Sequence, residues 1–393
     1  MPLSSGFAVP EFQAVRDLFE SFLGNDPQYS AQVSVYRAGT KVVDLTGGHR
    51  LTKDSITGAY SCSKGVAAFV IALLVQDGLL DLDRTVAHYW TDFAAHGKEA
   101  ITVRQALSHR AGLLGLEGGL ALSEFTTAEA ARKLAGTAPL WRPGTTFGYH
   151  ALTIGIIMEE LCRRVAGSSL QDMYASRIRR PFGIDFFLGL PEDQEPRYRD
   201  VLYDVDPGQP WLDPLGLEGL NGNAAVSTVM ELPNHRVIRK HGMSSAGGVG
   251  SAEGLARLYA AATTGLDGGP AFLAPATIST MSEEQVWGAG PRVRARQRLC
   301  GGLHEAPPQP QLRQPPGVRP RRRQCSAGLC RPRLRSRVRL HSRDAGGGPN
   351  AGPCTPAGPC GTAGGGHRRA ARAVGTYPRV GLSICSIFDA PLG

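Results

Sequence analysis

Residues 291–393 contain no lysine and almost no aromatic side chains. This stretch holds 19 arginines against three acidic residues, and its only aromatic residues besides histidine are Tyr377 and Phe388. Such a composition cannot bury enough apolar surface to offset the entropy lost on ordering, so we expect a disordered basic tail. Residues 1–290 carry 24 basic and 31 acidic residues. The change near residue 290 therefore separates this tail from a candidate folded domain.

Other absences exclude whole classes of protein. Residues 1–290 contain two of the eight cysteines, Cys62 and Cys162, so we expect no disulfide framework. The histidines and acids lack the spacing of a metal site, and we expect no metal and no other cofactor. The first six residues have neither a basic start nor an apolar core, so we expect no signal peptide, no membrane contact and a cytoplasmic location.

A Ser-x-x-Lys motif occupies residues 61–64, within the run Tyr-Ser-Cys-Ser-Lys-Gly. Residues three apart on a helix share one face, so the Ser61 hydroxyl and the Lys64 amine can meet. A lysine in a poorly solvated cleft can act as the base that a serine nucleophile needs, because desolvation disfavours the ammonium form. A helix N-terminus beside the serine also suits a developing oxyanion. An N-capping serine followed by a solvated lysine is the structural alternative.

The flanking sequence favours the catalytic interpretation. Residues 66–75 are apolar nearly all round, which is typical of a buried helix, and the run is too short to cross a bilayer. Gly78 is expected to close this helix. Residues 32–45 alternate on both sides of a glycine-containing turn, which predicts a β-hairpin. Lys64 would then lie at the mouth of a core helix.

Two further segments complete a resemblance to the serine β-lactamase-like hydrolases, which include class C β-lactamases, penicillin-binding D,D-peptidases and carboxylesterases of the same fold. Residues 107–113 read Leu-Ser-His-Arg-Ala-Gly-Leu, and residues 141–150 read Trp-Arg-Pro-Gly-Thr-Thr-Phe-Gly-Tyr-His. The resemblance covers about residues 32–290 and implies one α/β (α+β) domain over residues 1–290. In it an antiparallel sheet is flanked by helices, with a mostly helical lobe inserted at about residues 96–234 and the site in the cleft between lobes.

By this resemblance, Tyr149 is the tyrosine of the family's Tyr-x-Asn motif and assists proton transfer. Ala151 stands where a β-lactamase has the asparagine, and this departure favours an esterase. His150 is the one histidine that we place in the cleft, as a candidate substrate-binding residue. A core tyrosine beside a turn is the structural alternative for Tyr149. His109 is expected to be a structural hydrogen-bonding residue.

Residues 244–259 resemble the family's glycine-rich entry to a returning helix, with Ser251 as its predicted N-cap. Neither Ser244 nor Ser245 lies in a Gly-x-Ser-x-Gly elbow. An α/β-hydrolase nucleophile at either position is therefore not expected.

Three functions are compatible with these features. The first is a serine hydrolase that cleaves carboxylic esters or lactones through an acyl-enzyme on Ser61, with Lys64 as base. The second is a β-lactamase or D,D-peptidase-type amide hydrolase. For these two functions the expected partner is a small-molecule ester or lactam. The third is an inactive product that binds partners through its basic tail. The charge of this tail suits nucleic acid, but its lack of lysine argues against that partner. Acyl specificity and oligomeric state leave no sequence signal.

The tail composition is also that of GC-rich DNA translated out of frame, and we predict a frameshift near residue 290. Residues 318–322 can be encoded so that the +1 frame reads Phe-Gly-His-Ala-Gly, which is similar to the family's third motif. Residues 329–332 can likewise read Phe-Ala-Asp-Pro. Nucleotide sequencing across codons 285–330 should show a better open frame, whose restoration adds a His-small-Gly strand facing Ser61. DNA without such a frame would contradict the prediction.

Overall fold

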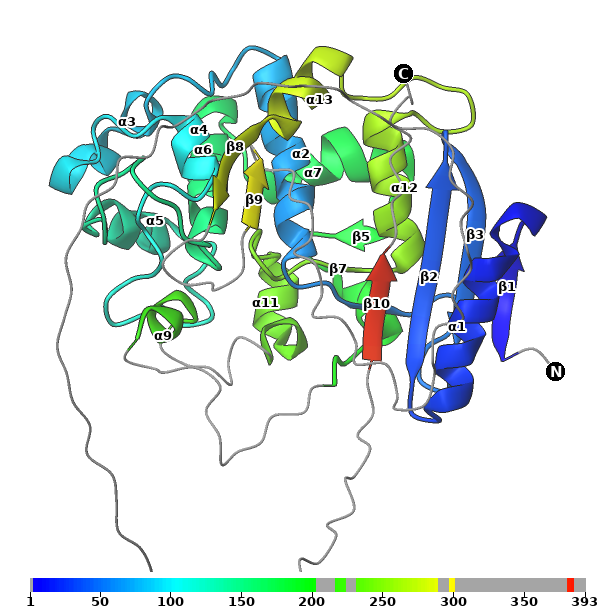
Figure 1. Cartoon of the computed structure of the whole chain (residues 1–393). Helices are drawn as coiled ribbons and strands as arrows, with labels where there is room; N and C mark the ends of the chain where they lie inside the picture. The colour runs from blue at the N-terminus through cyan, green and yellow to red at the C-terminus, as the bar shows by residue number, and fades with distance from the viewer. Residues whose placement is uncertain (1–2, 203–215, 224–230, 289–296, 301–379, 385–393) are drawn as a thin grey trace, which may run out of the picture. The chain divides into compact units, whose positions relative to one another are not determined.

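The computed structural model (Figure 1) describes residues 3–202, 216–223, 231–288, 297–300 and 380–384. Within these ranges the protein is a mixed α/β molecule, which confirms the predicted fold class. The predicted disorder or frameshift after residue 290 falls mostly outside the described residues.

The described residues form the following strands and helices. The strands are β1 (Ser4–Ala8), β2 (Ser30–Arg37), β3 (Thr40–Gly47), β4 (Ile56–Gly58), β5 (Phe186–Phe187), β6 (Tyr198–Arg199), β7 (Val249–Gly250), β8 (Glu284–Gly288), β9 (Gln297–Cys300) and β10 (Val380–Ile384). The helices are α1 (Gln13–Asn25), α2 (Cys62–Gln76), α3 (Val86–Tyr89), α4 (Val103–Leu107), α5 (Ala128–Ala135), α6 (Thr153–Ala166), α7 (Leu170–Tyr174), α8 (Arg180–Phe182), α9 (Leu217–Asn221), α11 (Arg236–His241), α12 (Ala252–Thr263) and α13 (Pro275–Ser282). Short 3₁₀ and π turns lie between several of them.

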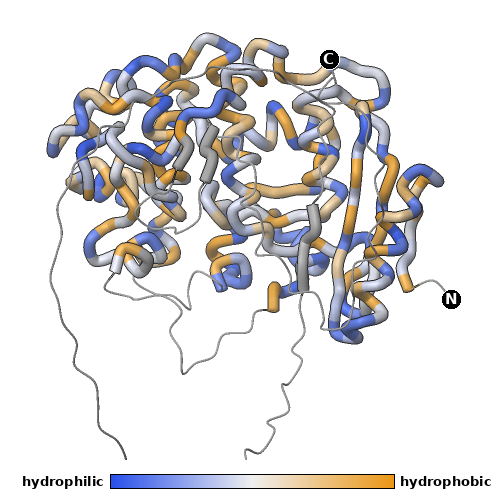
Figure 2. Tube along the Cα trace, viewed as in Figure 1, coloured by the Kyte–Doolittle hydropathy of each residue, from blue (hydrophilic) through white to orange (hydrophobic). Residues whose placement is uncertain are grey.

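The first sheet has the strand order β1-β3-β2-β10. β2 and β3 pair antiparallel, which confirms the predicted hairpin. Its two-residue turn, Ala38 and Gly39, has φ angles of 47° and 81°, the left-handed geometry that matches the twist of paired strands. α1 packs Phe19 and Leu23 against hydrophobic residues of these strands, and Figure 2 shows the hydrophobic residues along β2 and β3.

The basic tail contributes strands to two sheets. β9 pairs antiparallel with β8, and β10 pairs parallel with β2. The predicted disordered tail, residues 291–393, lies almost wholly outside the described residues, and its described parts are these two short strands at residues 297–300 and 380–384. The free N–H and C=O groups of a sheet edge can accept a strand through the backbone alone, so side-chain composition did not predict this pairing.

A second, smaller sheet supports the start of α2. Its strand order is β5-β7-β4-β6, and β4 pairs parallel with β6 and antiparallel with β7. β4 ends at Gly58, three residues before Ser61. The position of Ser61 is therefore tied to this sheet as well as to the helix that follows it.

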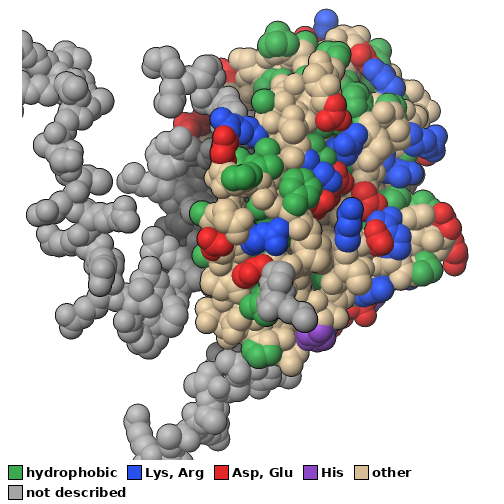
Figure 3. Space-filling view, turned by 90° about the vertical axis from the view of Figure 1, so that its right-hand side faces the viewer, with side chains coloured by type: hydrophobic (Ala, Val, Ile, Leu, Met, Phe, Trp, Pro, Cys, Tyr) green, Lys and Arg blue, Asp and Glu red, His purple; other side chains and the backbone are tan. Residues whose placement is uncertain are grey.

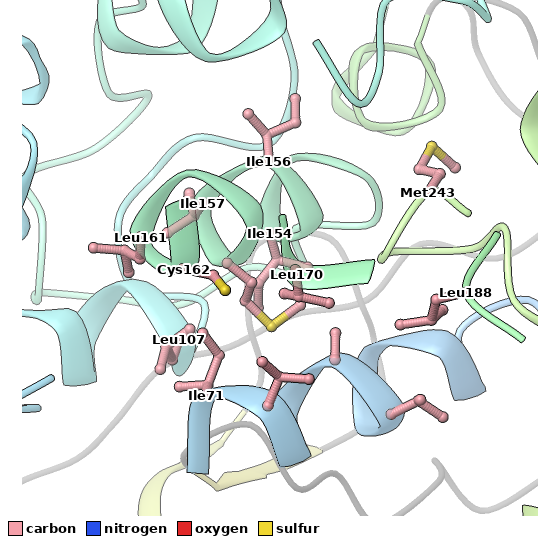
Figure 4. Close-up of a cluster of buried hydrophobic side chains, with 14 of the residues drawn as sticks. Ile71, Leu107, Ile154, Ile156, Ile157, Leu161, Cys162, Leu170, Leu188 and Met243 are labelled. Atoms are coloured by element: carbon pink, nitrogen blue, oxygen red, sulfur yellow. The ribbon is translucent and has the colours of Figure 1, made fainter. Parts of the chain in front are cut away.

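α2 is the central helix of the core. Residues 63–74 are all buried, which confirms the predicted buried helix, and Gly78 follows it with a φ of 71°. Figure 4 shows Ile71 beside Leu107, with Ile157 and Leu161 of α6 across from them. Burying one such side chain contributes about 1.5–3 kcal/mol. This packing fixes α2 against α6, the helix that begins four residues after Tyr149.

Between residues 96 and 234, the described elements are mostly helical. They include α4 to α9, and the strands β5 and β6 are only two residues long each. The boundaries of an inserted lobe stay a prediction.

Acidic and basic side chains are interspersed on the face seen in Figure 3. Ion pairs of the described residues include Lys41–Asp44 at 3.0 Å and Arg197–Asp185 at 2.7 Å. Pairs at or near the surface stabilise a fold by less than about 1 kcal/mol each, so the charge pattern contributes little to folding.

Candidate active site

Ser61 lies at the N-terminal end of α2, as its N-cap residue. The preceding Tyr60 has a φ of 45°, a left-handed conformation that is uncommon outside glycine. The Ala59 N–H donates to the Gly248 carbonyl at 3.0 Å, which ties this turn to the segment before β7. Ser61 itself is exposed and makes no capping hydrogen bond through its side chain. Its hydroxyl is therefore free of a capping role and open to a substrate.

Lys64 lies one helical turn farther on and is only 1% exposed. Its Nζ lies 3.0 Å from Ser61 Oγ and 2.7 Å from the carbonyl oxygen of Ser245. The alternative of a capping serine and a solvated lysine does not fit these positions.

Tyr149 completes a three-residue cluster. Its hydroxyl donates to Ser61 Oγ at 2.8 Å, and the centre of its ring lies 5.1 Å from Lys64 Nζ. Ser61 Oγ is thus within hydrogen-bonding distance of two groups that can carry a proton.

His109 holds the segment that carries Tyr149. Its carbonyl accepts from the Gly148 N–H at 3.1 Å, and its Nδ1 accepts from the His150 N–H at 2.9 Å. The rings of His109 and Tyr149 lie 5.1 Å apart, centre to centre. The position of Tyr149 therefore depends on a buried histidine, His109, that accepts hydrogen bonds from the residues before and after Tyr149.

His150 is fully buried. Its Nε2 accepts from the Leu113 N–H at 2.9 Å, which places the ring proton on Nδ1, 2.5 Å from the Gly148 carbonyl oxygen. These contacts join two stretches of backbone beneath Tyr149. They give no support to the substrate-binding role that the sequence suggested for His150.

The serines after residue 243 have structural positions. Ser251 is the N-cap of α12 and accepts from the Gly254 N–H at 3.0 Å, which confirms the predicted cap. Ser244 and Ser245 are both fully buried. Ser245 contributes its main-chain carbonyl to the site, as the acceptor for Lys64.

The sequence did not indicate three residues that hold the backbone around the site, Asn221, Glu159 and Gln171. Asn221 Oδ1 accepts from the Ala151 N–H at 2.7 Å, beside the position where the asparagine of the second motif is absent. Glu159 Oε1 accepts from the Ser244 N–H at 2.9 Å and from Gln171 Nε2 at 3.2 Å. The only sequence signal for any of them is an acid, Glu159, that follows an apolar stretch of α6.

Within the described ranges, no three His, Cys, Asp or Glu residues are grouped so as to hold a metal ion. Among the helices described there, none is long and apolar enough to span a bilayer.

A family model for β-lactamases matches residues 15–322 of the sequence. The chain belongs to the β-lactamase family. The match continues beyond residue 290, where the recognisable motifs end.

Solved structures of this family are similar to the chain over most of their length. EstA from Arthrobacter nitroguajacolicus is 53% identical with a TM-score of 0.74, covering 76% of this chain and 81% of that chain. A family VIII carboxylesterase is 30% identical with a TM-score of 0.68, covering 76% and 82%. A penicillin-binding protein homologue from Caulobacter crescentus is also 30% identical, with a TM-score of 0.65 and coverage of 76% and 82%.

A curated relative is the esterase/β-lactamase LipL of Mycobacterium tuberculosis. It is 32% identical over 210 residues, which are 51% of this chain and 49% of that protein. The chain thus spans about half the length of this relative.

Glu159 gives the β-lactamase-like domain a predicted pH dependence. Burial raises the pKa of its carboxyl from 4.5 to about 7. Between these values the folded state keeps a proton that the unfolded state has lost, so the free energy of unfolding falls as pH rises. Urea denaturation at about pH 5 and about pH 8 should show a smaller loss of stability in Glu159→Gln than in wild type. Equal losses in both proteins would contradict this assignment.

Proposed function

We propose that this chain is a serine hydrolase that cleaves carboxylic esters through an acyl-enzyme on Ser61. The observation that carries the proposal is the cluster at Ser61 Oγ, which has Lys64 Nζ at 3.0 Å and Tyr149 Oη at 2.8 Å. A nucleophile with a base within hydrogen-bonding distance is the arrangement that covalent catalysis requires.

The proposed reaction has two halves. Ser61 Oγ attacks the acyl carbon while neutral Lys64 takes its proton, and the alcohol leaves with a proton delivered through Tyr149. Water then attacks the acyl-enzyme, gives up its proton to the same pair of residues and releases the acid and free Ser61. Each proton taken up in the first half is returned within the cycle, so no cofactor is needed.

The N-terminal end of α2 supports the charge that develops on the acyl oxygen. Its positive dipole end lies beside Ser61, the N-cap residue. The N–H groups of Cys62, Ser63 and Lys64 donate to the carbonyls of Ala59, Tyr60 and Ser61. By the family resemblance, a second oxyanion donor comes from the strand of the third motif. The segment that we assign to that motif, residues 318–322, lies outside the described residues.

Ala151 is the feature that favours an ester over a β-lactam as substrate. A methyl group cannot hydrogen-bond the amide side chain that the asparagine of a β-lactamase contacts. Two proteins similar to this chain are named as esterases, the family VIII carboxylesterase and the esterase/β-lactamase LipL. A β-lactamase or D,D-peptidase activity is the second candidate, supported by the penicillin-binding protein homologue at 30% identity. A cytoplasmic location stays a prediction.

Substitution of the nucleophile tests the proposal directly. Ser61→Ala should abolish both fluorophosphonate labelling and hydrolysis of nitrophenyl esters, since no other residue would form the acyl-enzyme. Cys62→Ala, which changes the next exposed residue, is the matched control and should label at the wild-type rate. Labelling retained in Ser61→Ala would overturn the assignment, and turnover of a chromogenic cephalosporin above that of the esters would favour the second candidate.

Removal of the base tests the role of Lys64. Lys64→Ala should lower kcat for nitrophenyl esters on the order of a thousandfold, the scale of a lost general base. Lys98→Ala is the matched control, because Lys98 is equally buried but donates to the carbonyls of Ala95, Ala135 and Thr137. The control should lower the melting temperature and leave kcat of the folded protein close to wild type. Comparable losses of kcat in both variants would contradict a specific role for Lys64.

A further inference from the structure

The carbonyl oxygen of Ser245 is the second hydrogen-bond partner of Lys64, besides Ser61 Oγ. As a neutral amine, Lys64 has two N–H groups and one lone pair on Nζ. A hydrogen bond from one N–H to Ser245, at 2.7 Å, helps to direct the lone pair toward Ser61 Oγ, 3.0 Å away. In the described residues these are the two hydrogen-bond partners of Lys64, and Ala151 supplies no side-chain acceptor. The orientation of the base therefore depends on where the backbone holds this carbonyl.

We propose that Glu159 is a positioning residue for Lys64, acting through the backbone segment at residues 242–248. The inference rests on the function proposed above, since it assigns Lys64 the role of base. Among the described residues, the hydrogen bonds of Glu159 go to Ser244 and Gln171 and not to Lys64 or Ser61. Its carboxylate instead holds the segment whose carbonyl Lys64 uses.

The first half of this segment is anchored to α6 and α7. Glu159 Oε1 accepts from the Ser244 N–H at 2.9 Å, directly before the carbonyl of Ser245. Gln171 Nε2 bridges the same Oε1, at 3.2 Å, and the Gly242 carbonyl, at 3.0 Å. A Cβ on Gly155 would lie only 2.8 Å from Ser245 N. α6 thus holds the segment through one carboxylate and one closely packed glycine.

The second half is anchored to the start of α2 and to the turn that precedes it. The Gly248 N–H donates to Ser63 Oγ at 2.9 Å, and the Gly248 carbonyl accepts from the Ala59 N–H at 3.0 Å. Between the two anchors, the Gly247 N–H closes a turn onto the Met243 carbonyl at 2.7 Å. With both ends fixed, loss of the Glu159 contact releases the end nearer to Ser245.

The charged form of Glu159 is disfavoured in the fold. Desolvation of its carboxyl raises the pKa to about 7. Ionisable groups with perturbed pKa values collect at functional sites more often than elsewhere. The contact with Ser244, one residue from the carbonyl that Lys64 uses, gives this carboxylate a role that packing alone does not.

Three variants of the full chain test the proposal. Glu159→Ala removes the acceptor for the Ser244 N–H, whereas Glu159→Gln keeps a carbonyl oxygen that can accept from it. Glu160→Gln is the matched control, because Glu160 lies on the same helix and pairs with Arg163 and Arg164 without contacting the segment. Each variant is measured by kcat and KM for a nitrophenyl ester, and by hydrogen exchange of the peptide covering residues 242–248.

Glu159→Ala should lower kcat on the order of tenfold with KM within about twofold, because a misplaced base slows the chemical step and leaves substrate binding intact. It should also speed hydrogen exchange in residues 242–248. Glu159→Gln should restore most of both, and Glu160→Gln should change neither, even if it unfolds at a lower temperature. A change in KM alone, a wild-type kcat in Glu159→Ala, or equal losses in Glu159→Ala and Glu160→Gln would overturn the proposal.

The exchange measurement separates this proposal from the proposed function. If hydrogen exchange is faster only in Glu159→Ala, and wild type shows no Ser61-dependent turnover, the anchoring role stands and the esterase is overturned. Unchanged exchange together with Ser61-dependent turnover would do the reverse.

Discussion

The hydrogen bond between Lys64 and Ser61 is the contact on which the rest of the site depends. Bringing a lysine into the interior costs several kcal/mol if its amine is left without partners. Here the cost is offset by two oxygens, from Ser61 and Ser245, that lie within hydrogen-bonding distance of Nζ. The elements around Lys64 hold those two oxygens in place.

Three parts of the fold meet around this hydrogen bond. The small sheet and the turn at Tyr60 fix Ser61, the packing of α2 on α6 fixes the distance to Tyr149, and the segment at residues 242–248 supplies the carbonyl. Each is held by buried backbone hydrogen bonds, from Ala59 to Gly248 and from Gly148 to His109 among them. Because such contacts are lost together when the core opens, we expect the site to be as stable as the domain that carries it.

The departure from the family's second motif is compensated by backbone contacts around it. Ala151 contributes no side-chain hydrogen bond, and its N–H is held by Asn221. The residue between, His150, turns inward and joins Leu113 to the Tyr149 segment. Tyr149 therefore keeps its place beside Ser61, while the position that contacts amide substrates in a β-lactamase presents only a methyl group.

The sequence by itself determined the local parts of this protein. The Ser-x-x-Lys spacing, the apolar run of α2, the hairpin predicted at residues 32–45 and the Ser251 cap all depend on residues close together in the chain, so helical and strand periodicities predict them. Tertiary structure alone decided that Glu159, Gln171 and Asn221 support the site, that His150 is buried and that residues 380–384 add a strand to the hairpin. These contacts join residues that are up to hundreds of positions apart, many through main-chain atoms, which every residue possesses and which leave no pattern in a sequence.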